Sequence, residues 1–261
     1  MVEVAVYTID GKEEKKIILP EIFSYPVKEE LIRRAVVSER SYALQPQGHF
    51  LRAGQQTTAK YYGRMNSYRS GRHMGIAIRP REKLGGGRQG KVKVIPSAMK
   101  GKRAHPHVIE KIQFERMNNK EYQNALRSCI AANTKVHMPV VVNDKIQTIS
   151  KTKEILAVFN NLHLSNALET KKRLRKGVRR STRQRIYKKS LLFVVFNDAN
   201  AIKAARNIPG LDVCRLDQIN ANMLTPGGDY GRITVWSESA ISHSVEVINK
   251  LSPKTQSKNI S

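Results

Sequence analysis

Leu191-Leu192-Phe193-Val194-Val195-Phe196 is a continuous apolar run that ends at Asn197-Asp198. A strand that is buried on both faces needs apolar side chains at every position, so this run predicts a central strand of a parallel sheet. Working outward, the β-branched run Val140-Val141-Val142 predicts a short buried strand, and residues 211–215 and 232–236 predict two more. At the N-terminus, Asp10-Gly11 separates two strand-like runs, residues 2–9 and 16–19, which predicts a hairpin.

Segments with helical spacing alternate with these strands. Pro26 is expected to open a helix that reaches about residue 45, with Val27, Leu31, Ala35 and Tyr42 on one side. A second helix is expected to begin at a capping Asn119, and its apolar stripe places Cys129 in the core. Further helices are expected around residues 155–162, up to Asn207 after a cap at Asp198 or Asn200, and after Ser237. Strand–helix alternation of this kind predicts a three-layer α/β domain with a mostly parallel sheet.

The charge of the chain is large and concentrated. Lys and Arg outnumber Asp and Glu 47 to 21 in 261 residues, a net charge of +26. Residues 48–107 carry 14 Lys and Arg against one acid, Glu82, and residues 171–189 carry 11 with no acid. The rest of the chain is nearly neutral. Such self-repulsion points to an anionic partner, and nucleic acid is the leading candidate.

Residues 48–107 also have an unusual backbone composition, with ten of the 16 glycines and three prolines. Apolar residues there show no sustained period, so the segment cannot bury enough surface to offset its ordering entropy. It is predicted to be a long extended loop, inserted after the first helix, that orders on an anionic surface and reaches at most on the order of 100 Å. The predicted organisation is one globular domain (1–47 and 108–251), the basic loop (48–107) and a flexible tail (252–261).

Other kinds of site fit the sequence poorly. The run from Gly85 to Lys91 satisfies two glycine-rich nucleotide-binding patterns, but it lacks the preceding strand and the following helix that a phosphate site requires. His105-Pro106-His107, with His49 and His73, has no cysteine nearby to complete a zinc site. We therefore expect no catalytic residue, no metal and no cofactor.

The cysteines and the apolar segments bear on the compartment. Cys129 and Cys214 form no CxxC pair and are expected to be buried thiols of a reducing cytoplasm. The longest stretch without a charged residue has 14 residues and contains three asparagines, so no membrane span is expected. The N-terminus lacks the features of a secretory signal, and neither basic stretch offers a convincing apolar face to anionic lipid.

Phosphate binding suits the basic stretches, because guanidinium groups fit phosphate oxygens and glycine lets the backbone approach closely. Tyr61, Tyr62, Tyr68, Gln55, Gln56 and Asn66 are interleaved and could stack on or bond to unpaired RNA bases. The candidate rRNA-binding residues are Arg52, Lys60, Arg64, Arg69, Arg72, His73, Arg79, Arg81, Arg88, Lys91, Lys93, Lys100, Lys102, Arg103, His105, Lys171, Lys172, Arg173, Arg175, Lys176, Arg179, Arg180, Arg183 and Arg185.

The order of the motifs resembles the universal large-subunit ribosomal protein L4 family, in its archaeal and eukaryotic form. The resemblance covers most of the chain and is most specific in the stretch from Lys100 to Pro106 and in that from Gly231 to Ala240. It also includes Leu19-Pro20, Ser70-Gly71-Arg72, the run from Ile95 to Gly101, Met138-Pro139 and Pro226-Gly227-Gly228.

This resemblance implies a structural constituent of the large subunit, located in the cytoplasm, with rRNA and neighbouring ribosomal proteins as partners. It also implies a loop that threads through rRNA to the wall of the nascent-peptide exit tunnel. Residues 69–90 would approach the tunnel and the nascent peptide, and residues 91–105 would line the rRNA path back to the core. Residues 171–189 would bind rRNA from the globular side. Glu82 to Gly90 is longer than the family pattern, which leaves the residue at the tip open.

Two alternative functions share some of these features. An RNA-modifying enzyme, such as a methyltransferase, would need a glycine-rich turn directly after the first strand and an acid beyond the second. Asp10-Gly11 instead has the pattern of a hairpin turn. A DNA-compacting protein would share the charge, but it would not account for one long loop that leaves a neutral domain.

Overall fold

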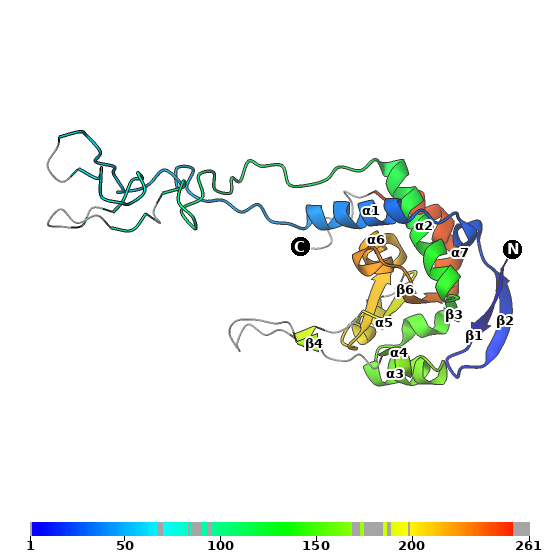
Figure 1. Cartoon of the computed structure of the whole chain (residues 1–261). Coiled ribbons are helices and arrows are strands. Elements are labelled where there is room, and N and C mark those ends of the chain that lie inside the picture. Colours follow the sequence, from blue (N-terminus) through cyan, green and yellow to red (C-terminus); the bar gives the residue numbers. More distant parts are fainter. Residues whose placement is uncertain are drawn as a thin grey trace. The chain divides into compact units, whose positions relative to one another are not determined.

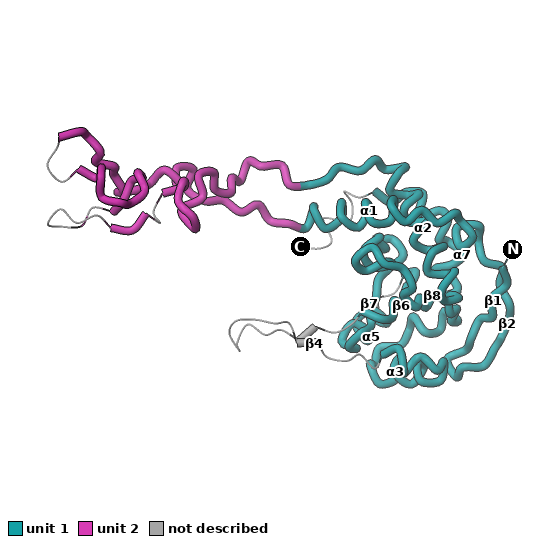
Figure 2. Tube along the Cα trace, in the orientation of Figure 1, with its two compact units in different colours: residues 1–43, 114–261 teal, residues 44–113 magenta. Residues whose placement is uncertain are grey.

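A six-stranded sheet forms the centre of unit 1, one of two units of the computed structural model; unit 1 comprises residues 1–43 and 114–261, and unit 2 residues 44–113 (Figure 2). The structure describes residues 2–66, 70–82, 84, 90–92, 95–168, 189–197 and 200–252, and the backbone of 173–174, 185–186 and 199. In spatial order the strands are β2 (Glu13–Ile18), β1 (Glu3–Tyr7), β3 (Val140–Val142), β8 (Ile233–Ser237), β6 (Leu191–Val195) and β7 (Leu211–Arg215). Only β1 and β2 are antiparallel among these neighbours, which confirms the mostly parallel sheet.

Helices cover both faces of this sheet and complete three layers (Figure 1). One face packs against α1 (Glu29–Tyr42), α2 (Asn119–Val136), α6 (Ala221–Leu224) and α7 (Glu238–Ile248). The other packs against α3 (Thr152–Asn161), α4 (Ser165–Leu168) and α5 (Ala199–Ala205). Short 3-10 turns lie at Glu21–Ser24, Asp144–Thr148, Leu216–Gln218 and Pro226–Gly228. A separate antiparallel pair joins β4 (Arg173–Leu174) to β5 (Arg185–Ile186).

Strand β6 shows why its apolar run decides the fold. Successive side chains of a strand point to opposite faces. Leu192 and Val194 enter the core under α1, α2 and α7, whereas Leu191, Phe193 and Val195 enter the core under α3 and α5. All five are fully buried, and each such burial contributes about 1.5–3 kcal/mol before entropy is counted.

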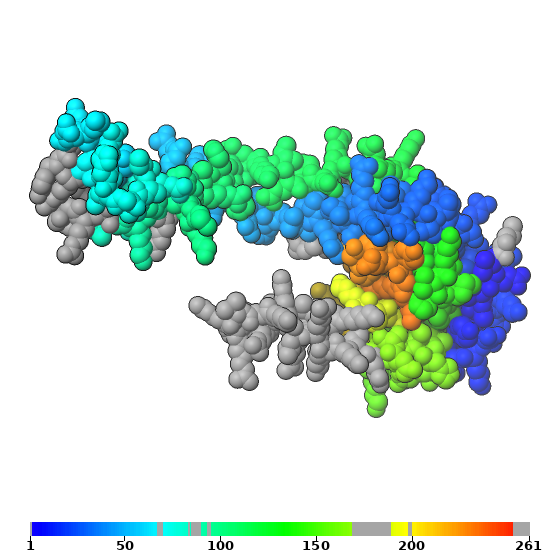
Figure 3. Space-filling model, viewed as in Figure 1, coloured from blue at the N-terminus to red at the C-terminus, as the bar shows by residue number. Residues whose placement is uncertain are grey.

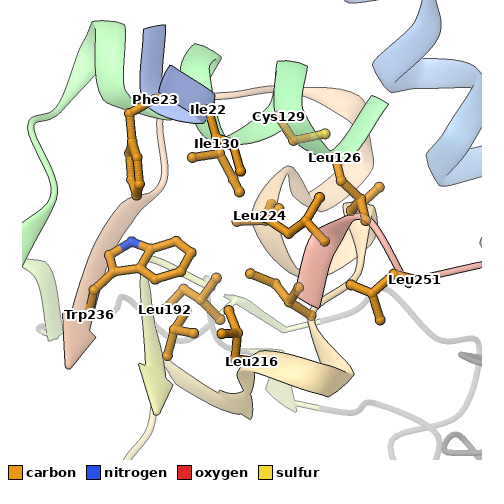
Figure 4. Packing of buried hydrophobic residues seen from close by; sticks show 14 of the residues in the cluster. Ile22, Phe23, Leu126, Cys129, Ile130, Leu192, Leu216, Leu224, Trp236 and Leu251 are labelled. Carbon is orange, nitrogen blue, oxygen red and sulfur yellow. The ribbon is translucent and has the colours of Figure 1, made fainter. Parts of the chain in front are cut away.

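The first of these cores is shown in Figure 4. Trp236 of β8 meets the Phe23 ring edge to face, with centroids 5.5 Å apart. Cys129 lies among the apolar side chains, as its place in the helical stripe predicted. Burial raises the pKa of its thiol to about 12 and that of Cys214 likewise, so both cysteines are protonated at neutral pH.

The first helix differs from its prediction in its start and its buried face. It begins at Glu29 because Lys28 is extended, with φ −121° and ψ 94°, so Pro26 lies outside it. Ile32, Ala35 and Val36 are buried, and Leu31 and Tyr42 are only partly covered. The strong N1 preference of proline gave the wrong start. Ala35 is buried as predicted, whereas Ile32 and Val36 are buried in place of Leu31 and Tyr42.

Smaller shifts occur elsewhere. Asn118, one residue before the predicted cap, precedes α2, and its side chain makes no cap bond. In α3, Leu156 is exposed and Val158 is buried in its place. Asn200 lies inside the first turn of α5 and Asp198 lies outside the described residues. Ser237 caps α7 as predicted, since its Oγ accepts a hydrogen bond from the Ala240 N–H at 3.3 Å.

The β1–β2 hairpin is confirmed. The Thr8 N–H donates to the Lys12 carbonyl at 2.8 Å, and Gly11 adopts the left-handed φ of +81° that closes the turn. This hairpin places β2 at one edge of the sheet and leaves β7 at the other.

Candidate nucleic-acid interface

Unit 2 consists of two extended arms that run in opposite directions beside each other (Figure 2). The His49 N–H donates to the His107 carbonyl at 3.0 Å, and the two imidazole rings stack with centroids 6.5 Å apart. Further out, Lys60 and Arg81 exchange two backbone hydrogen bonds of 3.1 and 3.2 Å. Between these points a Cβ at Gly54 would collide with the carbonyls of Arg103 and Ala104, so only glycine allows the arms to approach there.

Beyond the Lys60–Arg81 bridge the arms form two smaller loops. One is closed where the Gly71 N–H donates to the Tyr62 carbonyl at 2.5 Å. The other is closed where the Gly90 N–H donates to the Glu82 carbonyl at 2.8 Å. Residues 67–69 and 85–89, which include the candidates Arg69 and Arg88 and the glycine run of the nucleotide-like pattern, lie outside the described residues.

Most candidate cations of unit 2 are exposed to solvent; Figure 3 shows the narrow, uneven surface of this unit. One, Arg81, is half-buried, and Lys93 lies outside the described residues. The exposed candidates are Arg52, Lys60, Arg64, Arg72, His73, Arg79, Lys91, Lys100, Lys102, Arg103 and His105. In the part of the chain that the structure describes, every ion pair joins residues of unit 1. The described cations of unit 2 are therefore not neutralised by carboxylates there, which leaves them available to an anion.

Four of these side chains also hold unit 2 together. The Arg79 guanidinium donates to the Ser97 carbonyl at 3.0 Å, and that of Arg81 to the Ala77 carbonyl at 3.1 Å. Lys102 Nζ donates to the Gln56 carbonyl, and Arg103 lies 3.4 Å from the His107 ring nitrogen. The Arg79 and Lys102 bonds join residues 18 and 46 apart in the chain, whereas the Arg81 and Arg103 contacts are local, each to a residue four positions away.

Two candidates have a strained backbone. His73 and Lys100 adopt φ of 58° and 55°, in the left-handed region that residues with a Cβ seldom occupy. Such conformations cost on the order of 1 kcal/mol or more and concentrate at binding sites. Both side chains are exposed.

Unit 2 also exposes apolar side chains that the sequence analysis does not predict as contacts. Met65, Met74, Ile78 and Met99 are 54–90% exposed. They follow no helical or strand period, so no pattern could single them out. Beside a nucleic acid, such side chains can cover the faces of bases and sugars.

The second basic segment is described only in part. Lys171, Lys172, Arg175, Lys176, Arg179, Arg180 and Arg183 lie outside the described residues. Arg173 pairs with Ile186, and Arg185 with Leu174, in the β4–β5 backbone ladder. At the base of the segment, the Ser190 hydroxyl donates to the Ala167 carbonyl at 2.5 Å, and Lys189 lies 3.2 Å from Asp212. The two ends of the segment are therefore held together.

Two other kinds of feature, a metal site and a membrane span, are not found in the described part of the chain. Among the described residues no group of three or more His, Cys, Asp or Glu is placed to hold a metal ion. No helix in the described ranges is long and apolar enough to cross a bilayer. The exposed cations of unit 2 are therefore the candidate functional site.

Comparison with known proteins gives the family. A model of the "Ribosomal protein L4/L1 family" matches residues 17–247. The chain belongs to this family. The proteins named "Large ribosomal subunit protein uL4" from Methanococcus aeolicus and Methanococcus maripaludis are 36% and 37% identical to it, over 95% and 91% of this chain and 99% and 96% of theirs. The protein of that name from Methanocaldococcus jannaschii is 35% identical over 90% of this chain and 95% of its own. The resemblance seen in the motifs is confirmed.

Proposed function

We propose that this chain is a structural constituent of the large ribosomal subunit, acting in the cytoplasm as part of the ribosome and binding rRNA through unit 2 and residues 171–189. The observation that carries the proposal is the similarity to the uL4 proteins over nearly the whole of both chains. An alignment of that extent includes the globular unit and both basic segments. A shared sheet alone would say little about function.

The mechanism follows from the charges of unit 2. Each exposed Lys or Arg that neutralises a phosphate releases condensed counterions, which favours binding in a salt-dependent way. Few contacts join the arms, so they can adapt to RNA as they bind it. The 24 candidate residues of the two basic segments are proposed as the phosphate and base contacts.

A finer proposal concerns the outer part of the extension. By analogy with the family, residues 69–90 approach the peptide exit tunnel and meet the nascent peptide, and residues 91–105 follow rRNA back toward the globular unit. Other ribosomal proteins of the large subunit are the expected neighbours. The exposed cations and the exposed methionines in the described part of unit 2 support an RNA-lined environment.

The enzymatic alternative has no support. A methyltransferase-like cofactor site needs a glycine-rich turn that leads from the first strand into a helix. Here the turn at Gly11 leads from β1 into β2. The relatives are ribosomal proteins by name.

The decisive test is sedimentation of a cell lysate on a sucrose gradient, followed by a wash of the large subunits with about 1 M salt. Salt weakens contacts made by charge alone. We expect the chain to comigrate with the large subunit and to survive the wash, because an extension threaded between RNA helices is held by geometry as well. A chain that stays at the top of the gradient would overturn the ribosomal proposal.

A further inference from the structure

The two arms of unit 2 (Figure 2) bring two histidines and an arginine together, which we name the histidine cluster: His49, Arg103 and His107. The His49 N–H donates to the His107 carbonyl at 3.0 Å, and the two imidazole rings are inclined by only 24°. Nη1 of Arg103 lies 3.4 Å from Nε2 of His107. Gly54 allows the arms to approach beside the cluster, because a Cβ there would collide with the Arg103 carbonyl. All three side chains of the cluster are exposed.

The contact between Arg103 and His107 indicates the charge of this imidazole in the free chain. A guanidinium carries N–H donors and no acceptor. Nε2 of His107 therefore accepts from Arg103, which requires a neutral ring with its proton on Nδ1. A protonated ring would donate from both nitrogens and would face the guanidinium with a like charge.

The arms around the cluster carry cations and a single acid. Residues 44–56 of the outgoing arm contain one further charged residue, Arg52. Residues 100–113 of the return arm contain one acid, Glu110, which forms no ion pair with a described residue. The other basic residues there are Lys100, Lys102, His105 and Lys111. In the described part of unit 2, no ion pair therefore offsets the charge that the cluster gains when its histidines are protonated.

We propose that the histidine cluster binds a backbone phosphate of rRNA, and that the chain takes up protons on His49 and His107 as it binds. This inference rests on the proposed function, since it takes rRNA as the partner. Neither histidine is among the candidate rRNA contacts. A phosphate brings the negative charge that the cluster lacks, and imidazolium and guanidinium groups both donate charge-assisted hydrogen bonds to its oxygens.

The proton that His107 gains from solvent changes the role of its Nε2 atom. Nε2 becomes a donor, so its bond to Arg103 ends. The Arg103 Nη1 group and the His107 Nε2–H group, which lie 3.4 Å apart in the free chain, can then both donate to one phosphate. His49, whose ring lies beside that of His107, adds a second titratable charge to the same site.

Proton uptake distinguishes this site from the lysine and arginine contacts of unit 2. Lysine and arginine keep their charge throughout the neutral range. Histidine changes its charge between about pH 5 and pH 8, where the phosphates of RNA stay charged. The cluster thus adds a pH-dependent contribution to a binding reaction whose other contacts respond mainly to salt.

The test measures the affinity of the full chain for purified, protein-free large-subunit rRNA from about pH 5.5 to about pH 8, at constant ionic strength. The cluster variant combines His49→Gln with His107→Gln. The matched control combines His137→Gln with His163→Gln, at two exposed histidines of unit 1. We expect wild-type binding to be tighter at the acid end by about tenfold for each histidine that gains charge beside the phosphate. The cluster variant should lose this gain, and the control should keep it.

Arg103→Gln provides an independent readout. The guanidinium stays charged over the whole range, so its loss should weaken binding at every pH. The histidine variant, in contrast, should approach wild-type affinity at the alkaline end, where the rings are neutral in both the free and the bound chain. This difference in pH profile separates a charged phosphate contact from a contact that only holds the arms together.

The outcomes also separate the two proposals. If the wild-type chain does not bind rRNA at any pH, the proposed function fails. If it binds and the cluster variant shows the same pH dependence, the phosphate site is wrong. A loss of affinity in the cluster variant that is equal at all pH values would assign the histidines to joining the arms and would overturn the inference. An equal loss of pH dependence in the control would overturn it as well.

Discussion

At the scale of single residues, Glu39 is a buried acid that composition alone would place on the surface. Glu39 of α1 is 5% exposed. Its carboxylate accepts hydrogen bonds from the Tyr122 hydroxyl at 2.6 Å and from the Ala221 and Asn222 N–H groups at 2.6 and 2.8 Å. One side chain thereby ties α1 to α2 and to the start of α6. Burial raises its pKa and outweighs the opposing effect of these bonds.

Replacing Glu39 should lower stability through the lost hydrogen bonds and should remove the pH dependence that comes from its raised pKa. Glu39→Gln places an amide N–H against hydrogen-bond donors, so we expect the free energy of unfolding to fall by about 1–3 kcal/mol. Because the folded-state pKa of Glu39 is raised, the folded chain keeps this proton to higher pH than the unfolded chain does. Wild-type stability should therefore fall relative to that of Glu39→Gln as the pH rises from about 4.5 through the raised pKa.

Urea unfolding of the full chain over about pH 4 to 8 measures this difference. Glu30→Gln, at an exposed acid of the same helix, is the control and should show neither effect. A pH-independent difference between wild-type and Glu39→Gln would show that Glu39 does not titrate in the native state as inferred.

At the scale of elements, the junction between β8 and α7 shows how the first turn of a helix that directly follows a strand is capped. Ser237 accepts from the Ala240 N–H, and Asp144, from the neighbouring turn after β3, accepts from the Ser239 N–H at 3.0 Å. Two of the free N–H groups of the first helical turn are thus satisfied. The Ser237 side chain is fully buried, so water cannot take over its role.

Ser237→Ala should destabilise the chain by about 1 kcal/mol, the usual cost of losing an N-cap hydrogen bond. Ser242→Ala is the matched control on the same helix, because that residue is exposed and bonds only to the preceding turn. Denaturant midpoints of the two variants provide the measurement. Equal midpoints would mean that Asp144 alone caps α7.

How much of these elements could be predicted depends on whether the signal was local. The β6 run and the α2 stripe were predicted because one residue period fixes which side chains are buried. The start of α1 was not, since the chain beyond Pro26 stays extended. Glu39 was missed because its partners lie 83 and 182 residues away.

The candidate interface likewise combines features that have a local sequence signal with contacts between residues far apart in the sequence. Local charge counts identified the cations of unit 2, most of which are exposed, while the role of residues 171–189 stays a prediction. The bridge between Lys60 and Arg81, and the bond from Arg79 to Ser97, join residues that no sequence period relates. Leu156 of α3 is exposed, which reverses the sequence expectation for that residue.

At the scale of the whole molecule, the two apolar cores and the exposed cations of unit 2 that are proposed to bind rRNA lie in different parts of the chain. Two large apolar cores belong to unit 1. In the described part of unit 2, Ile95 is the one buried hydrophobic side chain. Unit 2 can therefore add little to the free energy of folding, and its cations would be costly for a core to accommodate.

Deleting residues 48–107, with a short Gly-Ser linker between the flanking residues, should leave a soluble unit that unfolds cooperatively. The bond between His49 and His107 brings the two arms together near the cut, so a short linker suffices. The shortened chain should enter large subunits poorly. Calorimetry and gradient sedimentation measure the two properties, and loss of cooperative unfolding would contradict the separation of roles.

Neutralising Arg173, Arg175, Arg179 and Arg180 to Gln should weaken rRNA binding and flatten its salt dependence. The slope of log K against log salt should fall by about 0.7–0.9 for each phosphate that the variant no longer neutralises. A matched control changes Lys12, Lys16, Lys145 and Lys153, exposed cations of unit 1, to Gln. An unchanged slope in the arginine variant, or an equal fall in the control, would remove the segment from the rRNA interface.

The outer strand β2 has a consequence for the free protein before it meets RNA. Its backbone edge faces solvent and could template another strand, yet its first four residues are Glu13, Glu14, Lys15 and Lys16. Charged residues on an exposed edge oppose strand addition by a second molecule. Under the proposed function, a newly made chain has to stay monomeric until it binds rRNA. The charged strand β2 thereby protects this edge of the sheet against pairing with a second molecule.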